Sequence, residues 1–194
     1  MIKLMFLLTR FSRYARLSLS TPLSYLILVM SGVKIGKKNL FDGVIRIVNQ
    51  SGRKSIIIGE KCRFNSSSRS NMIGINRPCI ISTHLPNSKI SIGNNCGFSG
   101  TVIGCFKEIY LGNNVRCGAN TLITDSDWHL NDPRSGIPKA VRIEDNVWLG
   151  VNSVVLKGVT IGTNSVIGAN SVVVKDIPAN VIAAGNPCKI IKYL

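Results

Sequence analysis

The stretch IEDNVWLGVNSVVLKGVTIGTNSVIGANSVV, residues 143–173, decides the fold because its aliphatic residues recur every six positions. The evenly spaced positions hold Ile143, Leu149, Val155, Ile161, Ile167 and Val173. An α-helix repeats its apolar face every 3.6 residues and a flat strand every two, so neither produces this period. A coil with three short flat sides does, because each side turns one aliphatic side chain inward before a tight turn rich in Gly, Asn or Asp. The sequence therefore predicts a mainly β protein in which 18-residue rungs stack.

The same period continues toward the N-terminus in shorter groups that begin at Ile35, Ile58, Ile92 and Leu111. Slips of register between these groups predict bulges or loops in the earlier rungs. The largest slip is DSDWHLNDPRSGIPKA, which starts at residue 125 and contains two prolines. A long loop that interrupts a rigid repeat is more often functional than incidental. We therefore expect an extruded loop at about residues 125–141 to carry the site.

Composition and charge limit the function classes. The net charge is +15, and residues 1–63 hold 12 Lys and Arg against two Asp and Glu. A basic excess favours nucleic acid, a membrane surface or an anionic small molecule as partner. Nucleic acid is disfavoured because no helix-turn-helix, zinc-finger spacing or basic strip with aromatics is present. The six cysteines form no CxxC pair and only two histidines exist, which predicts no metal site and a reducing, cytoplasmic setting.

The N-terminal segment, residues 1–34, differs from the repeat domain at residues 35–194. One helical face collects apolar side chains, whereas basic residues lie on the other and Pro22 is expected to end the pattern. A secretory signal is disfavoured because no A-x-A-like site follows Met30. We expect a helix that caps the column, with peripheral membrane association through residues 1–30 as a compatible second role. The apolar face is Leu4, Leu7, Leu8, Phe11 and Ala15, and the basic residues are Lys3, Arg10, Arg13 and Arg16.

The candidate catalytic residue is His129, within Asp125-Ser-Asp127-Trp-His129. If this segment is extended, its alternate side chains share a side, so two carboxylates flank the imidazole. A carboxylate on one ring nitrogen fixes the tautomer and leaves the other nitrogen as a base. We assign this orienting role to Asp127, and Asp125 stays an alternative. The other histidine, His84, precedes a turn at Pro86 and is expected to be a structural or surface residue.

Residues 35–194 resemble the hexapeptide-repeat acyltransferases, and closely the maltose and galactoside O-acetyltransferase branch that includes polysaccharide-modifying enzymes. The segment VRIEDNVWLG at 141–150 is similar to the signature that follows the catalytic loop in that branch. The segments KGVTIG at 157–162 and AGNPCK at 184–189 continue the likeness. The resemblance implies a left-handed parallel β-helix. It also implies a homotrimer with active sites between subunits.

The resemblance further implies a role for each matching residue. His129 takes a proton from an acceptor hydroxyl, which attacks the thioester of acetyl-CoA directly. Trp148 lies near the thioester, and backbone groups near Gly150 and Ala169 line the pantetheine arm. The anionic end of the coenzyme would meet Lys175, Lys189 and Lys192.

The implied activity is an acetyl-CoA-dependent O-acetyltransferase acting on a sugar hydroxyl in surface-polysaccharide biosynthesis, and no metal is required. The stretch Gly97–Thr101 departs from the family on the acceptor side, where it offers little side-chain chemistry. The sugar itself therefore stays open. Two alternatives also remain: an N-acyltransferase acting on an amino-sugar nucleotide, and a non-catalytic β-helix scaffold.

Overall fold

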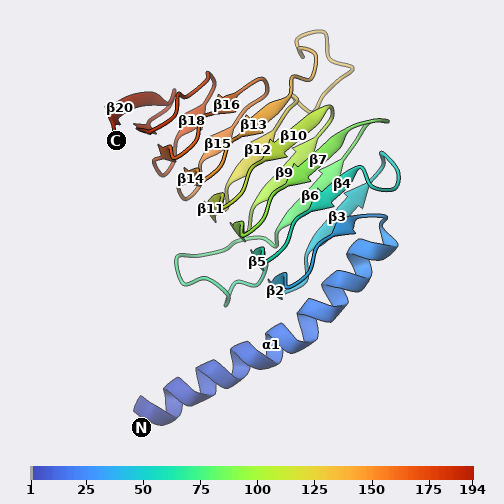
Figure 1. Cartoon of the computed structure of the whole chain (residues 1–194), viewed down its shortest axis with the longest axis vertical. Coiled ribbons are helices and arrows are strands. Elements are labelled where there is room, and N and C mark those ends of the chain that lie inside the picture. The colour runs from blue at the N-terminus through green and yellow to red at the C-terminus, as the bar shows by residue number, and fades with distance from the viewer. Residues whose placement is uncertain (1) are drawn as a thin grey trace.

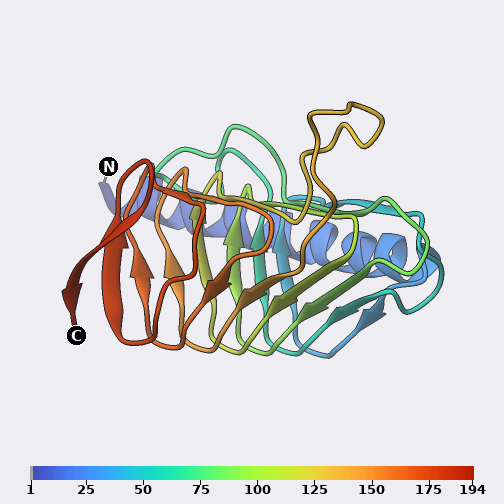
Figure 2. The same cartoon turned by 90° about the horizontal axis from the view of Figure 1, so that it is seen from above.

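A computed structural model of the chain describes the backbone of residues 2–194 and the side chains of residues 11–194. It is a three-sided column of parallel strands with one helix, α1 (Ile2–Met30), across its N-terminal end (Figures 1 and 2). Each strand from β1 to β19 pairs in parallel with a strand one rung away in the same sheet, whereas β20 runs antiparallel to β19. The coil expected from the six-residue period is therefore confirmed.

Three sheets form the sides of the column. The first sheet contains β1 (Lys34–Ile35), β4 (Ile56–Ile58), β7 (Lys89–Ile92), β10 (Glu108–Leu111), β13 (Val141–Ile143) and β16 (Thr160–Ile161). The second contains β2 (Leu40–Asp42), β5 (Arg63–Asn65), β8 (Gly97–Ser99), β11 (Arg116–Ala119), β14 (Trp148–Leu149), β17 (Val166–Ile167), β19 (Val181–Ala184) and β20 (Lys189–Tyr193). The third contains β3 (Arg46–Asn49), β6 (Ile80–Thr83), β9 (Val102–Cys105), β12 (Leu122–Thr124), β15 (Val154–Val155) and β18 (Val172–Val173).

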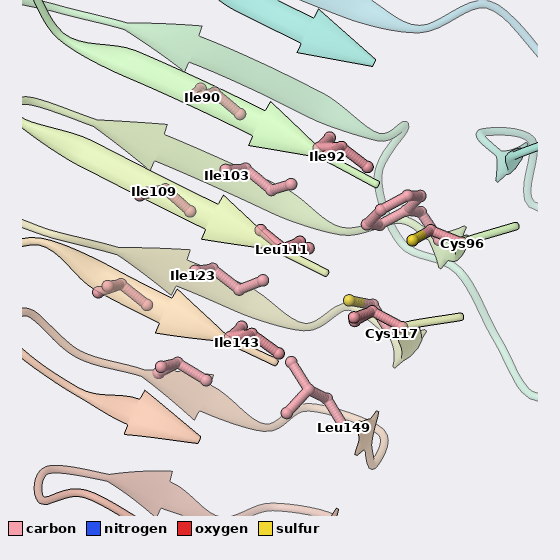
Figure 3. Close-up of a cluster of buried hydrophobic side chains, with 14 of the residues drawn as sticks. Ile90, Ile92, Cys96, Ile103, Ile109, Leu111, Cys117, Ile123, Ile143 and Leu149 are labelled. Atoms are coloured by element: carbon pink, nitrogen blue, oxygen red, sulfur yellow. The ribbon is translucent and has the colours of Figure 1, made fainter. Parts of the chain in front are cut away.

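The interior is a continuous stack of the predicted inward residues (Figure 3). All six positions of the 143–173 series are fully buried. In the lower rungs the rings of Phe41, Phe64 and Phe98 stack in succession, with centroids 4.8 and 4.9 Å apart. Burying each such side chain contributes about 1.5–3 kcal/mol, so the stack is the main source of stability.

A ladder of asparagine amides runs along the corner between the first and second sheets. Each of these residues has a positive φ, which Asn tolerates better than other non-glycine residues. Each side-chain amide donates to the next, as from Asn114 to Asn146 at 2.9 Å and from Asn146 to Asn164 at 3.0 Å. In the first two rungs the same corner holds Lys38 and Lys61, also at positive φ.

Helix α1 corrects two expectations. Pro22 does not end it, because hydrogen bonds from both sides of the proline hold the helix against the first rung. Thr21 Oγ1 accepts the Phe41 N–H at 3.1 Å, and the Tyr25 hydroxyl accepts the Asn39 N–H at 3.0 Å. These tertiary contacts outweigh the lost backbone bond.

The second correction concerns which face of α1 meets the column. The inward face mixes apolar and polar contacts: Leu28 lies in the hydrophobic core, whereas Ser20 and Ser24 are buried polar residues. Arg16 Nε also lies 3.0 Å from the buried Asp42 carboxylate. Phe11, from the predicted apolar face, is exposed instead. The side chains of Lys3, Leu4, Leu7, Leu8 and Arg10 lie outside the described residues. Within the described part of the chain, no helix combines the length and apolarity that crossing a bilayer requires.

Candidate active site

The loop expected at 125–141 leaves the column between β12 and β13 (Figure 2). Its first residue, Asp125, is fully buried and anchors the loop to the rung below. The carboxylate accepts N–H bonds from Phe106 at 2.7 Å, Lys107 at 2.7 Å and Glu108 at 2.8 Å. Because three backbone donors surround it, Asp125 is a structural anchor rather than a neighbour of His129.

Asp127 pins the loop at a second point. Its Oδ2 atom accepts the Gly136 N–H at 2.9 Å and forms an ion pair with Lys157. The Lys157 ammonium, followed by the Gly136 N–H, lowers the pKa of Asp127 below its ordinary value. The side chains of residues 125–129 do not alternate between two sides as expected, because the backbone is not extended: Trp128 has a φ of 69°, in the left-handed region. Within the chain, Asp127 therefore does not flank the His129 imidazole with Asp125.

His129 is exposed, and no described residue hydrogen-bonds its imidazole. It lines a hollow of about 840 Å³, which we call the corner hollow, at the corner between the third and first sheets. Trp128, His84, Phe106 and Gln50 also line it. An imidazole that faces an open hollow without an internal partner is free to accept a proton from a bound hydroxyl.

The sequence does not predict that His84, expected to be a structural or surface residue, lines this hollow. Its Nε2 lies 2.9 Å from Ser82 Oγ, and its ring stacks on Phe106 with centroids 4.6 Å apart. Burial lowers the pKa of His84, and the nearby Asp125 carboxylate opposes this shift. The pairing of Thr83 with Cys105 places His84 and Phe106 at equivalent positions of successive rungs. The register slips in the sequence hid that equivalence.

The structure brings three of the predicted cofactor residues together. Trp148, Gly150 and Ala169 line a groove of about 430 Å³, which we call the donor groove. Gly150 is required by close packing, since a Cβ there would lie 2.6 Å from the Ala169 nitrogen. Asn71 and Ile73, from the irregular segment between β5 and β6, complete the lining. Sequence reasoning did not single out either residue, because the segment has no period.

Two of the three predicted lysines share the face of the donor groove. Strand pairing aligns Trp148 with Val166, Val166 with Ile182, and Ile182 with Lys192. Three strand spacings place Lys192 about 14 Å from Trp148 across the sheet. Lys189 pairs with Ala184 on the same edge.

The third lysine, Lys175, is not on that face. It follows β18 of the third sheet, exposed, one rung of 18 residues beyond Lys157. Its position is therefore at the corner that carries the His129 loop.

The two predicted halves of the site lie on different corners of one chain. The donor groove lies at the corner between the second and third sheets, whereas the His129 loop lies at the corner between the third and first sheets. A single chain therefore presents a base at one corner and a donor groove at another. Among the described residues, no group of three or more His, Cys, Asp or Glu side chains is placed to hold a metal ion.

Comparisons with known proteins agree with this architecture. A family profile described as "Hexapeptide repeat of succinyl-transferase" matches residues 140–175. The galactoside O-acetyltransferase of Lactococcus lactis subsp. lactis is 50% identical over 88 residues, which is 43% of this chain and 42% of that protein. The chain thus spans less than half the length of this relative.

Solved structures extend the likeness to the whole column. The N-acyltransferase AntD of Bacillus cereus, as a point mutant with coenzyme A and an amino-sugar nucleotide, has a TM-score of 0.68 at 22% identity, covering 88% of this chain and 89% of AntD. A hexapeptide-repeat acetyltransferase of Vibrio cholerae complexed with acetyl-CoA has a TM-score of 0.54 at 26% identity, covering 91% and 79%. These findings identify the chain as a left-handed, hexapeptide-repeat β-helix that resembles acyltransferases of the galactoside O-acetyltransferase branch.

Proposed function

We propose that the protein is an O-acetyltransferase that moves an acetyl group from acetyl-CoA to a sugar hydroxyl in surface-polysaccharide assembly. The observation that carries the proposal is the free imidazole of His129 facing the corner hollow. Further support comes from the 50% identity to a galactoside O-acetyltransferase over 88 residues.

The reaction follows from these groups. His129 removes the proton of the acceptor hydroxyl as its oxygen attacks the thioester carbonyl, and the C–S bond then breaks to release coenzyme A. Trp148, Gly150 and Ala169 hold the pantetheine arm, while Lys189 and Lys192 meet the phosphates. Asp127 acts as a positioning residue, because its bonds to Lys157 and Gly136 fix the loop that carries the base. Lys175, at the other corner, would reach coenzyme A held by a neighbouring copy.

A homotrimer completes the site in this proposal. A closed ring of identical subunits joins two different patches of neighbouring copies. Here the two patches are the His129 loop and the donor groove, which lie on different corners. Each of three interfaces would then bring one base to one donor groove.

The test measures thiol release from acetyl-CoA with a panel of sugars and amino-sugar nucleotides. We expect turnover with a sugar, and a loss of about 10²- to 10⁴-fold in His129→Ala with the fold retained. Ile137→Ala, an exposed residue of the same loop that does not line the corner hollow, is the matched control and should keep full activity. Transfer only to amino groups would select N-acylation instead, and His129→Ala within threefold of wild type would refute the base. No turnover with any acceptor would favour a scaffold.

We also propose that the cytoplasmic enzyme docks on anionic membrane through α1. The outward face of α1 is an apolar stripe at helical spacing, formed by Leu19, Leu23, Leu26 and Met30, and Leu19 is 73% exposed. The lysines at positive φ in the first two rungs add charge at this end, where later rungs use asparagine. An apolar stripe with nearby basic residues suits an anionic lipid surface.

Vesicle sedimentation tests this docking. We expect the protein to sediment with vesicles rich in phosphatidylserine, to be released by salt, and to stay free of phosphatidylcholine vesicles. Leu19→Ser with Leu26→Ser should abolish sedimentation, whereas Ile137→Ser, a similarly exposed apolar residue in the loop between β12 and β13, should not. Equal sedimentation with both lipids, or none, would refute the lipid assignment.

A further inference from the structure

Three rings from successive rungs meet in the corner hollow. His84 follows β6, Phe106 follows β9, and Trp128 lies in the loop after β12. The His84 ring meets Trp128 edge-on at 4.9 Å, and Phe106 meets Trp128 edge-on at 5.3 Å. Because His84 and Phe106 also stack on each other, the two rings form a wall that supports Trp128.

The chain accepts an unfavourable backbone geometry to place Trp128. A bulky residue in the left-handed region is uncommon and strained, yet Trp128 has a φ of 69°. Its N–H donates to Ser126 Oγ at 3.2 Å, which holds that turn. The ring lies against the backbone of Gly104 in β9, where a Cβ would stand only 2.3 Å from Trp128 Cζ2. The indole ring therefore packs into the space that the absence of a side chain at Gly104 leaves open.

The seated indole still leaves much of its surface to solvent. Trp128 remains 41% exposed and lines the corner hollow next to His129, the proposed base. The Gln50 amide and the Asp132 carboxylate belong to the same lining. A flat apolar surface with a few polar groups around it is the usual composition of a small-molecule site.

We propose that Trp128 is the platform on which the acceptor's sugar ring stacks, with Gly104, Phe106 and His84 holding it in position. A pyranose has an apolar C–H face and a rim of hydroxyls, so it can cover the indole while its rim reaches polar groups. Stacking would leave one rim hydroxyl beside His129. The inference rests on the proposed sugar acetylation and names the acceptor side of that same site, for which the second-sheet stretch at residues 97–101 offers little.

Binding is tested without turnover. Trp128 and Trp148 are the only tryptophans in the chain, so Trp148→Phe leaves Trp128 as the sole indole reporter. Methyl pyranosides of glucose, galactose and their 2-acetamido forms are titrated while indole fluorescence is followed. At least one should give a saturable change, and the change should persist when His129→Ala is added. Saturation by a free nucleotide but by no sugar would overturn the stacking assignment.

Kinetics then separate the platform from the general fold. Trp128→Ala should raise the KM for the acceptor by about tenfold or more, leave the KM for acetyl-CoA unchanged, and be partly rescued in Trp128→Phe. Gly104→Ala should raise the acceptor KM too, since it displaces the ring without removing it. Ile137→Ala is again the control. If His129→Ala abolishes transfer while Trp128→Ala keeps the wild-type acceptor KM, the platform is refuted and the proposed reaction stands.

Discussion

Replacing Asp125 tests whether the loop's first carboxylate is an anchor or a catalyst. In Asp125→Asn, one oxygen becomes an NH₂ group, so at least one of the three backbone N–H groups faces a donor instead of an acceptor. A buried unpaired donor costs about 1–3 kcal/mol, and bonds to a charged acceptor are stronger than those to an amide. We therefore expect the free energy of unfolding to fall by about 2–4 kcal/mol in this variant.

Urea denaturation followed by circular dichroism measures this change at fixed protein concentration, because an oligomer's stability depends on concentration. Asp132→Asn, in the same loop and paired with the highly exposed Arg134, is the control and should leave stability nearly unchanged, because exposed ion pairs contribute little. Turnover per folded molecule should fall far less for Asp125→Asn than for His129→Ala. Unchanged stability with lost turnover would mean that Asp125 acts in the reaction, and the anchoring argument would be wrong.

Two other predictions concern charge. Replacing both Lys189 and Lys192 with Ala should weaken coenzyme A binding, and the loss should be largest at low salt, as calorimetry at two ionic strengths can show. A 3′-dephospho analogue of coenzyme A should lose less affinity than coenzyme A itself. If both ligands lose equal affinity, the two lysines do not bind the phosphate. Asp127→Asn should loosen the loop and lower turnover. Because Lys157 lowers the pKa of folded Asp127, the stabilisation from the ion pair is fully present at neutral pH and down to about 3.8, and it disappears as the pH falls through the lower folded value. Proteolysis of the loop should therefore be faster in the variant at pH 7, and a rate equal to wild type there would contradict the pinning role.

Much of the fold could be predicted because the six-residue period reports directly on which side chains point inward. The series from Ile143 to Val173 is buried without exception, and the loop leaves the column where the period stops. The resemblance to the hexapeptide-repeat acyltransferases singled out Trp148, Gly150 and Ala169, and all three line one groove. Their contact with acetyl-CoA stays a prediction.

The rest depended on local geometry that no period encodes. The left-handed turn at Trp128 separates Asp127 from the side expected for it, and tertiary contacts carry α1 through Pro22. The sequence did not predict that His84 lines the corner hollow, because irregular segments between rungs change the number of residues from one rung to the next. Pattern reasoning cannot align side chains across such segments.

The most direct test of the account is complementation between two inactive variants. His129→Ala lacks the base, and Ala169→Trp, at an exposed position, fills the donor groove. If each site is built from the base of one copy and the groove of its neighbour, co-expressed chains mixed at random should recover about a quarter of wild-type turnover. Turnover no greater than the sum of the two separate variants would contradict a site shared between copies.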